Sequence, residues 1–132
     1  MLLLPKGVKL VMETDLNERL KKFALRIIRL YSALPRRGPA LVLGNQVLRS
    51  GTSPGAHYRE ARRAKSDADF ISKIEGALQE LDETQYWLEL ISEAAIIPAK
   101  RLMPLQQEAE ELIAILVTIT KSVKRRGRAR RR

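Results

Sequence analysis

The sequence contains no cysteine, a single histidine (His57) and few aromatic residues. The absence of cysteine excludes disulfides, thiolate nucleophiles and zinc-finger sites, and it fits a reducing cytosol. One histidine cannot form a histidine-rich metal site, and no Glu-x-x-His pair exists, because Pro54 stands three residues before His57. The di-metal sites of ferritin-like bundles need two such pairs. No glycine-rich phosphate loop occurs either. We therefore expect no enzymatic activity, no catalytic residue, no metal and no cofactor.

Long apolar runs are also missing. The stretch LIAILVTIT, between Glu111 and Lys121, is too short to span a bilayer. The opening MLLLPKGVKLVME lacks a basic leading region and is interrupted by Pro5 and Lys6, so it is a poor secretory signal. We expect a soluble, cytoplasmic protein.

Strict alternation of apolar and polar residues, which is typical of strands, occurs nowhere in the chain. Three stretches instead repeat apolar residues at steps of three and four, as one face of a helix does. The first begins near Asp15, which with Glu18 resembles a capping box, and ends before Pro35. The second begins at Ser66, with acidic residues in its first turn. The fold is predicted to be all-α, with core positions Leu16, Leu20, Phe23, Ile27, Leu30 and Leu34; Phe70, Ile74, Ala77, Leu81, Thr84, Leu88 and Ile91; and Leu102, Leu105, Ala109, Leu112, Leu116, Ile119 and Val123.

Residues 39–65 leave two alternatives open. Pro39 suits the first turn of a helix, and helical spacing continues through small residues around Gly51 and Gly55. Pro54 cannot donate a backbone hydrogen bond, and its ring crowds the Ser50 carbonyl, so a continuous helix would be kinked there. The other interpretation is a break, with Ser53 capping a new helix. In a packed helix we expect position 51 to accept alanine and to reject leucine.

The net charge of +10 is concentrated at the C-terminus. Residues 124–132, KRRGRARRR, contain seven basic residues and no acid, and we expect this tail to be disordered. By length the chain is one domain, divided into an N-terminal extension (1–14), a helical bundle (15–123) and the tail (124–132). A second basic concentration closes the 39–65 segment. Because arginine pairs bidentately with phosphate, the predicted nucleic-acid-binding residues are Arg59, Arg62, Arg63, Lys65, Lys124, Arg125, Arg126, Arg128, Arg130, Arg131 and Arg132.

The last helix is apolar around nearly its whole circumference, more than one bundle core covers. We therefore predict an oligomer interface that includes Trp87, Ile113, Ile115 and Val117. The alternative is a deep core with a few exposed apolar side chains, which are normal in monomers.

The runs RSGTS, GA, YREA, DFI and ELDETQYWLEL, within roughly residues 15–125, resemble the bacterial four-helix bundle protein family, also called the 23S rRNA intervening sequence protein family. The resemblance implies an antiparallel, up-and-down four-helix bundle that assembles into a ring, commonly a pentamer. Distant relatives, the accessory variability determinant proteins of diversity-generating retroelements, associate with a reverse transcriptase and nucleic acid. Family members usually carry an aliphatic residue at the position of Pro54 and asparagine at that of His57. With the resemblance added, we favour a second helix that is kinked but continuous, with Gly51, Gly55 and Ala56 as a helix-packing seam.

The function expected from the sequence is a non-enzymatic homo-oligomer, most simply a homopentamer, that binds RNA or DNA, or a nucleoprotein such as a reverse transcriptase complex. Phosphate contacts would carry the binding, because no base-reading module is recognisable. The alternative is a protein-interaction scaffold with an acidic protein partner and no nucleic-acid binding. A weaker alternative is an unrecognised enzyme.

Overall fold

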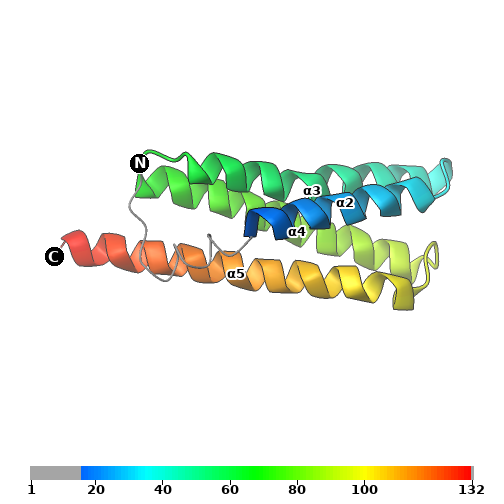
Figure 1. The fold of residues 1–132 in the computed structure, drawn as a ribbon. Coiled ribbons are helices and arrows are strands. Elements are labelled where there is room, and N and C mark those ends of the chain that lie inside the picture. The colour runs from blue at the N-terminus through cyan, green and yellow to red at the C-terminus, as the bar shows by residue number, and fades with distance from the viewer. Residues whose placement is uncertain (1–15, 132) are drawn as a thin grey trace.

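The computed structural model describes residues 16–131, which form four α-helices and no strand. The helices are α2 (Leu16–Ala33), α3 (Gly38–Arg62), α4 (Asp67–Glu93) and α5 (Ala99–Arg131). They lie side by side and are joined by short turns at alternating ends of the bundle (Figure 1). This confirms the prediction of an all-α fold with four helices. Asp15, its part in the capping box, the extension 1–14 and Arg132 lie outside the described residues.

The helix α3 runs through Pro54 without interruption. The hydroxyl of Ser53 donates to the carbonyl of Arg49, four residues earlier, at 2.7 Å. Thr52 donates in the same way to the carbonyl of Leu48 at 2.7 Å. These bonds are typical of hydroxyls inside a helix, whereas an N-cap hydroxyl would accept from an amide further along the chain. The interpretation of Ser53 as the cap of a new helix was therefore wrong.

The start of α4 follows the prediction closely. Ser66 is the N-cap, and its side chain accepts a hydrogen bond from the amide of Asp69 at 3.0 Å. Asp67 and Asp69 lie in the first turn, where their charge meets the positive end of the helix dipole. All the core positions predicted on α4 and α5 are buried, as are those on α2 apart from Leu30, which is half-buried.

The seam between α2 and α3 depends on Gly51. A Cβ atom at position 51 would lie 2.6 Å from Ile27 Cγ1 and 2.9 Å from Ile27 Cγ2. Gly55 has looser contacts, with Leu20 Cβ at 3.7 Å from the corresponding point. Ala56 is exposed, so its assignment to the packing seam was wrong. Gly51 is thus the position where only a missing side chain lets α2 and α3 approach.

His57 packs against α4. A Cβ atom at Gly76 would lie 3.1 Å from both Cε1 and Nδ1 of His57, so the imidazole occupies the space that a larger residue would need. About two turns earlier on α3, the hydroxyl of buried Ser50 lies 2.8 Å from that of buried Thr84. The α3–α4 contact is the most extensive in the bundle, and α2–α5 the least. His57 is therefore a packed residue within the chain.

The tail is helical, which corrects the expectation of disorder. The last helix continues to Arg131, beyond its last buried apolar residue, Val123. Two physical reasons account for this. Arginine is a good helix former, and extending an existing helix needs no new nucleation. In addition, Lys124 pairs with Glu75 at 3.4 Å, and Arg126 pairs with Asp67. The boundary predicted at residue 123 therefore does not separate a folded bundle from a disordered tail.

Candidate nucleic-acid interface

Two basic segments, distant in sequence, lie at the same end of the bundle. The first closes α3 and continues into the turn before α4, and the second forms the last turns of α5 (Figure 1). The Arg126–Asp67 pair joins the second segment to the helix that directly follows the first. We call this surface the tail end; it contains Arg59, Arg62, Arg63, Lys65, Lys124, Arg125, Arg126, Arg128, Arg130 and Arg131. It includes all the predicted nucleic-acid-binding residues except Arg132.

The α3 part of the tail end presents exposed cations. Arg59 donates from Nε to Asn17 Oδ1 at 3.3 Å, and Arg62 lies 6.0 Å above the ring of Tyr58. Burial raises the pKa of Tyr58, while the charge of Arg62 opposes this. Neither arginine, nor Arg63 or Lys65, pairs with a carboxylate within residues 16–131. Their charges are therefore available to an external anion.

The α5 part divides into paired and unpaired cations. Lys124 and Arg126 are paired with acids of α4, as described above. Arg125, Arg128, Arg130 and Arg131 are exposed and form no ion pair with an acid of the described chain. Because the segment is helical, Lys124, Arg128 and Arg131 recur at steps of four and three on one face.

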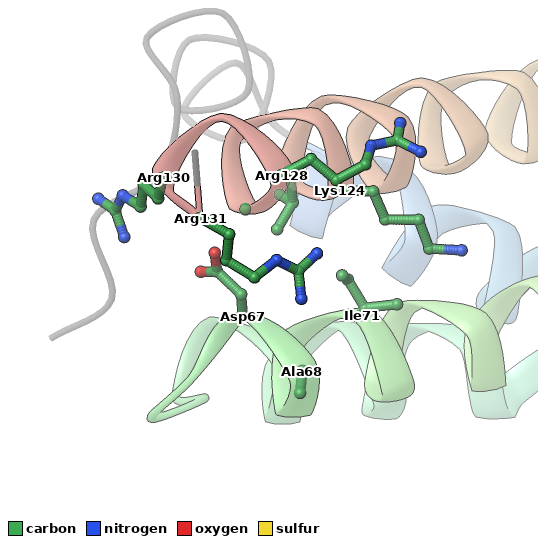
Figure 2. A pocket seen from close by; sticks show the side chains of 9 residues that line it. Asp67, Ala68, Ile71, Lys124, Arg128, Arg130 and Arg131 are labelled. Atoms are coloured by element: carbon green, nitrogen blue, oxygen red, sulfur yellow. The ribbon is translucent and has the colours of Figure 1, made fainter.

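A shallow groove separates this face of α5 from the first turns of α4. Figure 2 shows Asp67, Ala68 and Ile71 on one side and Lys124, Arg128 and Arg131 on the other. Arg131 extends toward the groove, and Arg130 points away from it (Figure 2). An arrangement of exposed guanidinium groups with few acids suits binding of phosphate oxygens, through bidentate and charge-assisted hydrogen bonds.

Half of the acidic residues of α4 are ion-pair partners of basic residues on α3 and α5. Glu75 pairs with Lys124, and Arg49 reaches Glu83 at 2.6 Å and Glu80 at 3.2 Å. The hydrogen bond to Glu83 raises the pKa of Arg49. Among residues 16–131, no group of three potential metal ligands occurs.

Sequence reasoning missed a basic stripe on α2. Arg19, Lys22, Arg26 and Arg29 follow the same three-four spacing that identified the apolar faces, so the signal was present. Arg19 bridges to α5, donating to both oxygens of Glu108 at 2.6 and 3.1 Å and lying 3.6 Å from Glu111. The hydrogen bond to Glu108 raises the pKa of Arg19. The stripe therefore follows the α2–α5 side of the bundle.

The four predicted interface residues are half-buried within the single chain. Trp87, Ile113 and Ile115 pack against the core, and Val117 is also partly covered. The indole Nε1 of Trp87 is buried without a hydrogen-bond acceptor in the described part of the chain. The large apolar side chains that remain exposed are elsewhere: Leu25, Ile28, Leu41, Val42, Tyr86 and Met103. A single bundle thus covers part of the apolar surface from which the oligomer interface was predicted.

The chain belongs to the 23S rRNA-intervening sequence protein family, whose model matches residues 12–118. A solved structure of a Bacteroides thetaiotaomicron protein of unknown function, from the S23 ribosomal protein family, is 40% identical with a TM-score of 0.76. The similarity covers 80% of this chain and 97% of that one. No curated protein matches the sequence. The α3 part of the tail end lies inside the matched residues, and the α5 part follows them. None of the described helices could cross a membrane.

Proposed function

We propose that this protein is a non-enzymatic, cytoplasmic, homo-oligomeric bundle that binds nucleic acid, RNA or DNA, through phosphate contacts at the tail end. The observation that carries the proposal is the position of both basic segments at the same end of the bundle, where Arg62, Arg63, Arg128 and Arg131 are exposed and form no ion pair within residues 16–131. The family name, with its reference to a 23S rRNA intervening sequence, adds weak support for RNA.

Phosphate contacts at the tail end would cost little free energy to form. An arginine that already has a carboxylate partner must exchange it for phosphate, whereas the unpaired arginines only release water. Each contact also releases condensed counterions from the nucleic acid, which makes binding strongly dependent on salt. No group of base-reading residues supports sequence specificity, so the proposed binding follows charge and shape.

Assembly into an oligomer would raise the affinity for nucleic acid above that of one tail end. In a homopentameric ring, the state that the family resemblance implies, several tail ends would act on one polyanion. Binding at one tail end raises the effective concentration of the others, so modest affinity per chain becomes strong binding by the ring. We also propose that Pro54 bends α3 locally, because its ring crowds the Ser50 carbonyl. A reverse transcriptase complex as partner stays a prediction from the resemblance alone.

The test replaces unpaired arginines of the tail end in the full-length chain and measures fluorescence anisotropy with labelled RNA and DNA. We expect Arg62→Gln/Arg63→Gln and Arg128→Gln/Arg131→Gln each to weaken binding. The matched control is Arg36→Gln/Arg37→Gln, which removes the same charge in the α2–α3 turn at the opposite end of the bundle. Equal losses for all three variants would show that only net charge matters. Binding of acidic proteins but of no nucleic acid would favour the protein-scaffold alternative.

A further inference from the structure

A second groove lies between α2 and α5, at the end of the bundle opposite the tail end. Three arginines line it: Arg26 and Arg29 from α2, and Arg101 from α5. The remaining lining is apolar and includes Leu30, Ala33 and Leu105. No carboxylate belongs to the lining. The groove thus combines three positive charges with an apolar floor and no acid, whereas Asp67 belongs to the lining of the groove at the tail end.

Within the described part of the chain, no acid neutralises the three arginines. Arg19, on the same stripe of α2, is occupied by Glu108 and Glu111. Arg26, Arg29 and Arg101 form no ion pair with any acid in residues 16–131. The first turn of α5 contains no acid, so nothing there offsets the charge of Arg101. Three like charges that converge on one groove repel one another, and an anion between them would relieve this repulsion.

The apolar floor decides which anion fits. Leu102 and Leu105 are buried, and Leu30 packs against the core, so the floor is part of the folded bundle. A duplex offers phosphates but keeps its bases stacked inside. A single strand offers both phosphates and free base faces, which stack on guanidinium planes and cover apolar surface. The groove encloses about 280 Å³, just below the usual range for small-molecule sites, which suits a base or a single nucleotide.

We propose that this groove binds a segment of single-stranded nucleic acid, with its phosphates on Arg26, Arg29 and Arg101 and a base against the apolar floor. The inference rests on the proposed function and deepens it, because it gives the protein a preference for single strands over duplexes. The arginines of the tail end would bind the phosphates of single strands and of duplexes alike. The groove adds affinity only where bases are free.

The experiment compares a labelled single-stranded RNA with the corresponding duplex, using the full-length chain and anisotropy titrations. Arg26→Gln/Arg29→Gln should weaken single-strand binding by about fivefold or more and duplex binding by less. The control Arg36→Gln/Arg37→Gln loses the same charge at the same end but outside the groove. A second pair of variants changes the exposed residue Ala33. Ala33→Glu places a carboxylate four residues after Arg29 and should weaken single-strand binding, whereas Ala33→Gln, of similar size, should have little effect.

The outcomes separate this inference from the proposed function. If tail-end variants weaken all binding while groove variants change single strands and duplexes equally, or not at all, the groove proposal is overturned and the proposed function stands. The same holds if Ala33→Glu and Ala33→Gln behave alike. If the full-length chain binds neither form at low salt, both proposals fail. Circular dichroism of each variant verifies that the bundle is intact.

Discussion

Arg126, near the end of α5, pairs with Asp67, the first residue of α4, and thereby holds the end of one helix against the start of another. The two side chains are only 16% and 25% exposed. Asp67 also lies at the positive end of the α4 dipole. The same pair keeps one arginine of the tail end from external anions. The pair therefore affects both the helical structure of residues 124–131 and the number of arginines in this segment that can bind an external anion.

Asp67→Asn should loosen the last turns of α5 and strengthen nucleic-acid binding. The substitution keeps the size of the side chain but removes its charge, so Arg126 is released and one acid leaves the tail end. We expect the free energy of unfolding to fall by about 1 kcal/mol or less. Hydrogen exchange should become faster in residues 124–131, with higher affinity in anisotropy titrations. Weaker binding, or unchanged exchange in this segment, would contradict the role given to the pair.

Gly51→Ala should destabilise the bundle. Alanine ordinarily gains about 1 kcal/mol over glycine inside a helix. Here its methyl group would meet Ile27 Cγ1 and Cγ2, which are both attached to the branched Cβ and cannot rotate away together. We expect a net loss of about 1 to 3 kcal/mol in urea unfolding at fixed protein concentration. This reverses the expectation from sequence that position 51 accepts alanine.

The double variant Gly51→Ala/Ile27→Ala tests the cause of that loss. Ile27→Ala alone removes buried methyl groups and should cost about 2 to 5 kcal/mol. With alanine at position 51 the truncation also removes the clash, so the two losses should sum to more than the double variant shows. Additive losses, or a Gly51→Ala protein as stable as the wild type, would mean that the close contact is not the reason for glycine here.

The buried hydroxyl pair of Ser50 and Thr84 should behave as a unit. Thr84→Val leaves the buried hydroxyl of Ser50 without this partner, and we expect a cost of about 1 to 3 kcal/mol. Ser50→Ala should cost less, because Thr84 Oγ1 still donates to the Glu80 carbonyl at 2.7 Å. In Ser50→Ala/Thr84→Val no hydroxyl of the pair remains to be satisfied. The double variant should therefore be about as stable as Thr84→Val, measured by thermal unfolding. Strictly additive losses would show that the two hydroxyls act independently.

The purified protein should be a stable oligomer at micromolar concentration. The apolar side chains that one bundle leaves exposed, such as Val42 at 59% and Tyr86 at 53%, supply apolar area for contacts between copies of the chain. Light scattering should give a multiple of the 15.0 kDa chain mass, with a pentamer expected from the resemblance. A monomer mass would remove both the ring and the multivalent binding that depends on it.

Much of the fold was predictable because its causes are local. The stripe from Phe70 to Ile91 and the cap at Ser66 depend only on spacing and on the first turn of α4, and both predictions were confirmed. The contacts between helices were not predictable in this way. Gly76 shows no local sign that it accommodates His57, because the two meet only after α3 and α4 pack together.

The helical tail was missed for a similar reason. Its composition, considered alone, favours disorder, but the acids that hold it, Glu75 and Asp67, come from another helix. The residues of the candidate site were therefore predicted from composition, whereas their position at the same end of the bundle was not. The arginines of the α2–α5 groove were not predicted, because none of them belongs to a dense basic run. On α2 the basic residues are spread along the helix between apolar ones.

The central claim, that the tail end binds nucleic acid by phosphate contacts, is tested most directly by the salt dependence of binding. The comparison is between the full-length chain and a chain lacking residues 124–132, by anisotropy at several salt concentrations. The deletion removes no fully buried apolar side chain, so the bundle should remain folded, with a small loss of helix content from the missing turns. Affinity should fall, and the slope of log K against log salt should become shallower by about 0.7 per lost contact for single strands and about 0.9 for duplex DNA. The remaining arginines of α3 should leave weaker binding. Equal affinity and equal slope for the two chains, or no binding by the full-length chain even at low salt, would contradict the account.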